Sequence, residues 1–96
     1  MAQFNLGQLV ATAGVAEAMR ENPDFDAFVW ESLRRYLACD WGDLEDSDKE
    51  LNDNAVKSND DRILAAYKKK DGKAWKIWII TEWDRSATTI LFPDEY

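Results

Sequence analysis

The chain has 96 residues, 46% of them hydrophobic, and its 19 acidic and 12 basic residues give a net charge of −7. This length and apolar content predict one domain, residues 1–96, with a hydrophobic core, and exclude a disordered chain. The negative charge disfavours direct binding to nucleic acid, because phosphate neutralisation needs clustered Lys and Arg side chains.

The first residues lack the basic start and the apolar segment of a secretory signal. The single cysteine, Cys39, excludes an internal disulfide, which fits a reducing compartment. The longest apolar run is shorter than the roughly 20 residues that cross a bilayer. We therefore expect a cytoplasmic protein with no membrane association.

The first third of the chain predicts two helices after a short apolar run at residues 4–12, which could be a strand or an extended lead-in. Good helix formers follow from Gly14 and predict a short helix that stops at Asn22 and Pro23. The same pair starts the next helix, because Asn suits the N-cap and Pro suits the first helical position. One apolar stripe at helical spacing marks this second helix: Phe25, Phe28, Val29, Leu33, Tyr36 and Leu37.

A third, acidic helix is predicted at residues 47–57. Ser47 and Glu50 match the S-x-x-E capping box that marks a helix start. We expect this helix to pack through Leu51 and Ala55, and to present acidic side chains on its remaining face.

The last third of the chain has the alternating pattern of β-strands. Three runs predict strands at residues 62–69, 74–83 and 88–92. Asp71 and Gly72 predict a tight hairpin between the first two, and a polar turn at residues 84–86 joins the last two. This order of elements predicts an α+β fold in which N-terminal helices pack on a three-stranded antiparallel β-meander.

The residue types argue against catalysis and metal binding. The chain has no histidine, which removes the usual general base and the usual metal ligand. The acidic run from Asp46 matches the start of a calcium-binding loop, but Leu51 stands where that loop needs Gly and Lys57 stands where it needs Glu. We therefore expect a non-enzymatic protein with no catalytic residue, no metal site and no cofactor.

Two polar segments remain as candidate interaction sites. Residues 40–61 hold nine acids and two lysines, and the turn at residues 84–86 brings acid, base and hydroxyl groups together. Structural use, contact with a partner and catalysis are all open for this turn, where we expect Arg85 to pair with Asp43 or Glu82. The candidate interaction residues are Trp41, Asp43, Asp46, Asp48, Asp53, Glu82, Trp83, Asp84, Arg85 and Ser86.

Four segments carry a family resemblance: residues 7–15 (GQLVATAGV), 40–56 (DWGDLEDSDKELNDNAV), 62–67 (RILAAY) and 77–96 (IWIITEWDRSATTILFPDEY). They are similar to a widespread group of small bacterial proteins described as plasmid-related, which occur on plasmids, phages and integrated elements. The chain departs from the family pattern at Ala13, where members often have Pro, and at Trp83, where they often have a small residue. The resemblance implies no settled activity. It does imply an accessory role for a mobile genetic element in the bacterial cytoplasm, such as countering host defence.

Two functions follow as hypotheses. The favoured one is a non-enzymatic protein that binds a nucleic-acid-handling host protein, such as a nuclease, as an anti-restriction or anti-CRISPR type of inhibitor. The acids of residues 40–61 would occupy a basic groove that normally holds phosphates. The alternative is a small ligand- or metal-binding domain or enzyme, centred on Thr81 to Thr89 with Asp40 to Asp43. The partner, the host process and the oligomeric state stay open at this stage.

Overall fold

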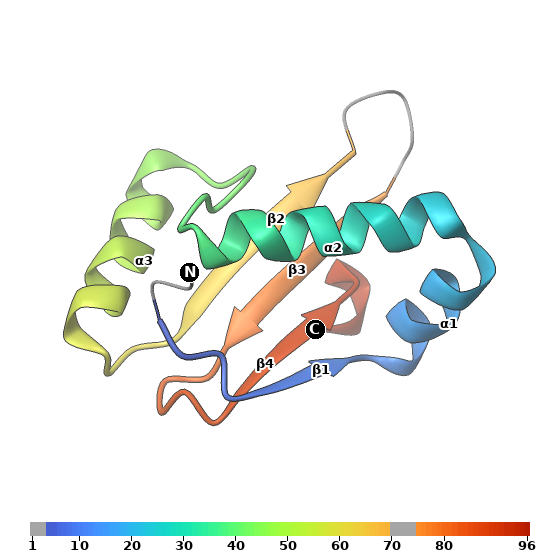
Figure 1. Cartoon of the computed structure of the whole chain (residues 1–96). Helices are drawn as coiled ribbons and strands as arrows, with labels where there is room; N and C mark the ends of the chain where they lie inside the picture. The colour runs from blue at the N-terminus through green and yellow to red at the C-terminus, as the bar shows by residue number, and fades with distance from the viewer. Residues whose placement is uncertain (1–3, 70–74) are drawn as a thin grey trace.

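A computed structural model describes residues 4–69 and 75–96 as an α+β fold with one mixed sheet (Figure 1). In chain order the elements are β1 (Gln8–Ala11), α1 (Ala13–Glu21), α2 (Pro23–Leu37), α3 (Asp46–Ser58), β2 (Ile63–Lys68), β3 (Lys76–Thr81), β4 (Ala87–Leu91) and the 3-10 helix η1 (Pro93–Glu95). Helix α2 crosses one face of the sheet. Helix α3 lies beside β2, at one edge of the sheet. The predicted hairpin residues Asp71 and Gly72 lie outside the described residues.

The sheet corrects the expected three-stranded antiparallel meander. Strands β2, β3 and β4 are antiparallel neighbours, as predicted, but the strand order is β1-β4-β3-β2 and β1 runs parallel to β4. The strand alternative for residues 4–12 is therefore right for Gln8–Ala11. Its pairing was missed because a contact between the first and last strands depends on the whole chain path rather than on a local pattern.

Helix boundaries follow local signals in α2 and depart from them in α3. The Asn22 side chain accepts hydrogen bonds from the backbone N–H groups of Asp24 and Phe25, as predicted for an N-cap. Helix α3 instead has Glu45 at its N-cap, with no side-chain hydrogen bond, so the predicted capping box at Ser47 does not form.

The buried face of α3 also differs from the predicted one. Ala55 is buried as expected, but Leu51 is 65% exposed. Asn52 takes the buried place instead. A helix with few apolar residues leaves its inward face undefined by periodicity, so contacts with the sheet decide it.

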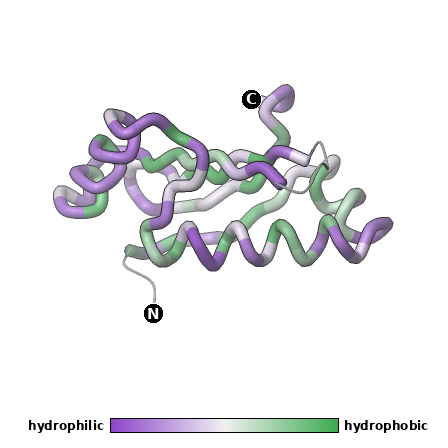
Figure 2. Tube along the Cα trace, turned by 90° about the horizontal axis from the view of Figure 1, so that it is seen from above, coloured by the Kyte–Doolittle hydropathy of each residue, from purple (hydrophilic) through white to green (hydrophobic). Residues whose placement is uncertain are grey.

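The core lies between α2 and the sheet face that it covers. The apolar stripe of α2 packs on alternate strand residues, including Ile63 on β2, Ile79 on β3 and Ile90 on β4. Figure 2 shows the alternation of hydrophobic and hydrophilic residues along α2 and the mostly hydrophilic character of α3. No helix within residues 4–69 and 75–96 is long and apolar enough to cross a membrane.

A chain of hydroxyl groups crosses this core. Tyr36 Oη lies 2.7 Å from Thr81 Oγ1, which lies 2.7 Å from Thr88 Oγ1, and Thr88 donates to the backbone carbonyl of Leu6 at 2.8 Å. Because each hydroxyl has one proton, the last bond requires Thr81 to donate to Thr88 and Tyr36 to donate to Thr81. Burial raises the pKa of Tyr36, so its proton stays in place. The chain joins α2, β3, β4 and the segment before β1.

Glycine is required where this segment turns into β1. Gly7 has φ of +63°, and a Cβ atom there would overlap the backbone of Arg85 and Ser86. The Gln8 N–H then donates to the Ser86 carbonyl at 3.0 Å, which places β1 beside β4. A close backbone approach of this kind is open only to glycine.

We expect Leu33→Ala to lower the free energy of unfolding by about 2–5 kcal/mol. Leu33 is only 5% exposed, on the buried face of α2, so truncation of its side chain leaves a cavity. Leu51→Ala is the matched control, since the same atoms are removed from a side chain that is 65% exposed. It should change stability by no more than about 0.5 kcal/mol. Urea denaturation of both variants checks this, and an unchanged midpoint for Leu33→Ala would show that the packing assignment is wrong.

Candidate protein-binding site on helix α3

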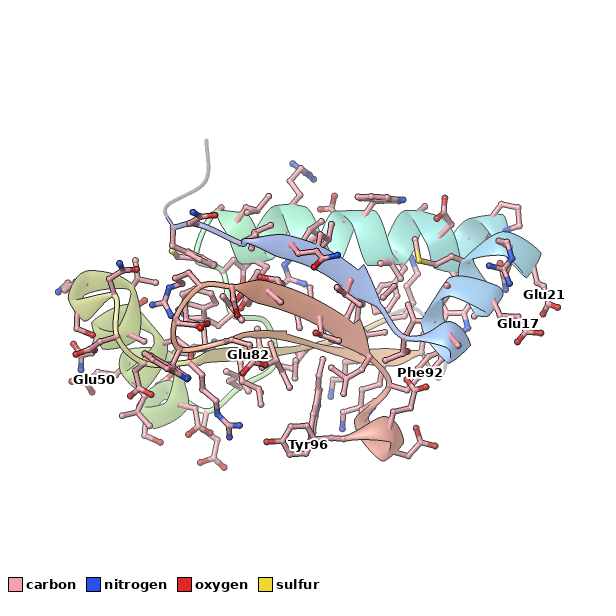
Figure 3. The ribbon with its side chains drawn as sticks, turned by 90° about the horizontal axis from the view of Figure 1, so that it is seen from below. Glu17, Glu21, Glu50, Glu82, Phe92 and Tyr96 are labelled. Atoms are coloured by element: carbon pink, nitrogen blue, oxygen red, sulfur yellow. The ribbon has the colours of Figure 1, made fainter. Side chains whose placement is uncertain are left out.

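The N-terminal half of α3 carries three exposed acids, which lie on different sides of the helix. Asp46, Asp48 and Glu50 are all exposed, and the exposed Leu51 lies beside them. We call these four residues the α3 surface. Figure 3 shows Glu50 at this end of the molecule, far from the acids Glu17 and Glu21 on α1.

A groove adjoins the α3 surface on the side of β2. Its volume is about 350 Å³, and it is lined by Leu44, Asp48, Leu51, Asn52, Asp61, Arg62 and Leu64. We call it the α3 groove. Leucine side chains form its apolar part, and carboxylates at Asp48 and Asp61 lie on its wall. This volume is at the lower end of the range of roughly 300–1,000 Å³ that is typical of small-ligand pockets.

Polar contacts, in addition to the packing of Ala55 and Val56, hold α3 in place. The Asn52 side chain donates to the Leu64 carbonyl at 2.8 Å and accepts from the Leu64 N–H at 3.3 Å. The buried indole of Trp41 donates from Nε1 to Asp53 Oδ1 at 2.9 Å. Asp53, a predicted interaction residue, therefore has a structural bond that a substitution would break.

The connector before α3 covers the outer edge of β2. The Asp43 N–H donates to the Ala66 carbonyl at 2.7 Å, and Asp43 Oδ2 accepts from the Lys68 N–H at 3.0 Å. Gly42, with φ of +76°, makes the bridge to Ala66. Trp41 lies in the core and is only 2% exposed, so its burial does not support its place among the candidate interaction residues.

Arg85 is buried beneath α3 and contacts backbone carbonyls, so the predicted side-chain pair with Asp43 or Glu82 is wrong. Its guanidinium donates to the carbonyl of Ala55 at 2.8 Å and to that of Asp61 at 2.6 Å. Two longer bonds of 3.2 Å reach the carbonyls of its own turn. A cation is favourable here because the C-terminal end of a helix carries partial negative charge.

The other predicted residues of this turn are exposed. The Ser86 N–H donates to Asp84 Oδ1 at 3.0 Å, and hydrogen bonds from Ser86 lower the pKa of Asp84. Glu82 and Ser86 supply backbone groups to the sheet, whereas Trp83 is 62% exposed next to the Arg85 contacts. Trp83 is thus the one apolar side chain of the turn available to a partner.

The structure therefore separates the predicted interaction residues into two groups. Asp46 and Asp48 lie on the α3 surface, while Trp41, Asp43, Asp53 and Arg85 hold the fold together. Glu50 was expected on the acidic face but not among the interaction residues, and Leu51 was wrongly predicted to be buried. No signal in the sequence separates Leu51 from a core leucine, because a helical pattern with only three apolar members fits several faces.

The arrangement offers little acid–base chemistry. The hydroxyls of Thr81 and Thr88 are fully buried in the core. Asp40 is bound to Arg35, whose Nε lies 2.8 Å from Oδ2. Within the described ranges, no three carboxylate or thiol groups are placed to share a metal ion.

Comparison with protein-family models, with curated protein sequences and with solved structures finds no match to the chain. The α3 surface and the α3 groove are therefore interpreted from their own geometry.

We expect Arg85→Ala to lower the free energy of unfolding by roughly 3 kcal/mol or more, because bonds from a charged group contribute roughly 1.5–3 kcal/mol each. Arg34→Ala is the control, since the Arg34 side chain is 75% exposed in an ion pair with Glu31. That change should be much smaller, because an exposed ion pair contributes little to stability. Chemical denaturation measures both, and equal losses would contradict the role given to Arg85.

The pair of Arg35 and Asp40 predicts a weak dependence of stability on pH. The hydrogen bond from Arg35 lowers the pKa of Asp40, so the folded state favours the ionised carboxylate. Asp40→Asn should therefore reduce stability at pH 7 by less than about 1 kcal/mol, since the pair is partly exposed. The difference should disappear as the pH falls through the lowered pKa. Denaturation at pH 7 and pH 2 tests this, and a constant difference would point to lost packing instead.

Proposed function

We propose that this chain is a non-enzymatic protein that binds the basic surface of another protein through the α3 surface and the α3 groove. The observation that carries the proposal is the exposed Leu51 among Asp46, Asp48 and Glu50, beside a groove of about 350 Å³. Hot spots of protein interfaces lie in desolvated pockets near the centre of the interface, and weaker contacts around them exclude water. The site has the apolar centre and the charged rim of such an interface.

The partner that this chemistry fits presents Lys or Arg side chains around an apolar group. The cationic groups would approach Asp48 and Glu50, and the apolar group would enter the α3 groove beside Leu44 and Leu51. Carboxylates on one rigid helix would steer the encounter over a Debye length of roughly 8 Å at physiological ionic strength. Trp83 would extend the contact if the partner reaches the turn after β3.

The biological setting rests on the family resemblance. A nucleic-acid-handling protein, such as a nuclease, has a basic groove of the required kind. An acidic protein encoded on a mobile element would occupy that groove and block it, as an anti-restriction or anti-CRISPR type of inhibitor. The cytoplasm of the bacterial host is where such a contact would occur.

The alternative of an enzyme or ligand-binding domain centred on Thr81 to Thr89 has less support. Its cationic group, Arg85, is turned into the protein and bonded to carbonyls. Its acidic group, Asp43, is bonded to the edge of β2.

Charge reversal on the α3 surface tests the proposal. The parent chain and two double variants serve as baits for bacterial lysate, with captured proteins identified by mass spectrometry. Asp48→Lys with Glu50→Lys should abolish capture of a basic partner, because the attraction becomes repulsion. Binding of the parent should also weaken as salt rises.

Glu17→Lys with Glu21→Lys is the matched control, since it makes the same change in net charge on exposed residues of α1. This control should retain the partner. Equal loss in both variants would show that total charge, and not the α3 surface, governs binding. Full retention in both would show that the interface lies elsewhere.

A further inference from the structure

One edge strand of the sheet has its outer backbone groups covered, and the other does not. The outer edge of β2 is covered, since its backbone groups bond to Asn52 and Asp43 at Leu64, Ala66 and Lys68. The other edge is β1. Figure 3 views the molecule from this side, and no other helix or strand lies in front of β1.

The backbone of β1 has unused hydrogen-bonding groups. The N–H groups of Gln8 and Thr12 donate to β4, at Ser86 and Ile90. Successive residues of a strand point their N–H and C=O groups to opposite sides, so those of Leu9 and Ala11 point outward. Within residues 4–69 and 75–96, no hydrogen bond to these outward groups is found.

The side chains of β1 include none of the types that prevent an edge strand from pairing with another strand. All four residues are exposed, and none is charged or proline. Leu9 is 41% exposed and Val10 is 38% exposed. Edge strands of monomeric proteins usually carry a charge, a proline, a bulge or a covering segment against such pairing.

We infer that β1 pairs antiparallel with β1 of a second copy of this chain. A two-fold axis at Val10 would place Leu9 of each copy opposite Ala11 of the other. Each pair of Leu9 and the partner's Ala11 would then exchange two backbone hydrogen bonds. The two symmetric pairs give four hydrogen bonds in all. The product is one eight-stranded sheet.

Two features favour a second copy over an unrelated strand. The outer edges of the eight-stranded sheet would both be β2, which is already covered, so the assembly closes after two copies. The axis also separates the acidic surfaces, because α3 lies toward one end of β1 and α1 toward the other (Figure 1). The α3 helices of the two copies would lie at opposite ends of the dimer, where their repulsion is screened.

Sedimentation of the full chain across a range of concentrations tests the dimer. An interface of one short strand pair is small, so we expect a dissociation constant on the order of 100 µM. Amide exchange measured by NMR supplies the register: the amides of Leu9 and Ala11 should gain protection as concentration rises, while that of Gln8 is protected throughout.

Leu9→Lys with Ala11→Lys should weaken the dimer at least tenfold, since like charges would oppose each other across the strand pair. Leu51→Lys with Ala27→Lys is the matched control, with the same changes at exposed helix positions. Both variants reduce the net negative charge equally, so a loss confined to the first cannot come from general repulsion. A chain that stays monomeric at about 1 mM, far above the expected constant, overturns the inference. Unprotected Leu9 and Ala11 amides in a dimer, or equal weakening by the control, would do so as well.

Discussion

The guanidinium of Arg85 is the contact on which the acidic end of the molecule depends. Helix α3 buries only Asn52 and Ala55, so apolar packing gives it little hold on the sheet. Arg85 reaches from the turn after β3 to the carbonyls of Ala55 and Asp61, which end the helix and begin the approach to β2. One buried cation thus joins the end of α3 and the loop before β2 to a turn that lies 24 to 30 residues later in the sequence. Together with the bonds of Asn52 to Leu64 and of Trp41 to Asp53, it fixes the position of the α3 surface.

Arg85 and the acids of the α3 surface lie toward opposite ends of the helix. The exposed Asp46, Asp48 and Glu50 belong to its N-terminal half, whereas the guanidinium bonds to the Ala55 carbonyl in its last turn, where the helix dipole is negative. The cation therefore holds the helix without occupying the acidic surface. The carboxylates therefore remain available to a partner, and the proposed binding role and the stability of α3 rest on the same contact.

The parts of this structure that could be predicted are those with local causes. Asn22 and Pro23 define a helix start through bonds to the next residues, and the alternation from Ile77 to Thr81 assigns each strand side chain to a face. The partners of Arg85 and the parallel pairing of β1 depend on which distant backbones arrive nearby, and no residue pattern records that. The prediction of which face of α3 points inward was wrong for a related reason. Asn52 is buried for its hydrogen bonds, which hydrophobic periodicity does not detect.

The bonds of Asn52 require an amide at this position. Its amide nitrogen donates to the Leu64 carbonyl, and its oxygen accepts from the Leu64 N–H. Deamidation to aspartate would keep the acceptor but replace the donor by a second oxygen, which repels the carbonyl. A change of a single group would thus uncover part of the β2 edge while adding a negative charge to α3. On a helix that already exposes Asp46, Asp48, Glu50 and Asp53, this buried position needs the neutral amide rather than its acid.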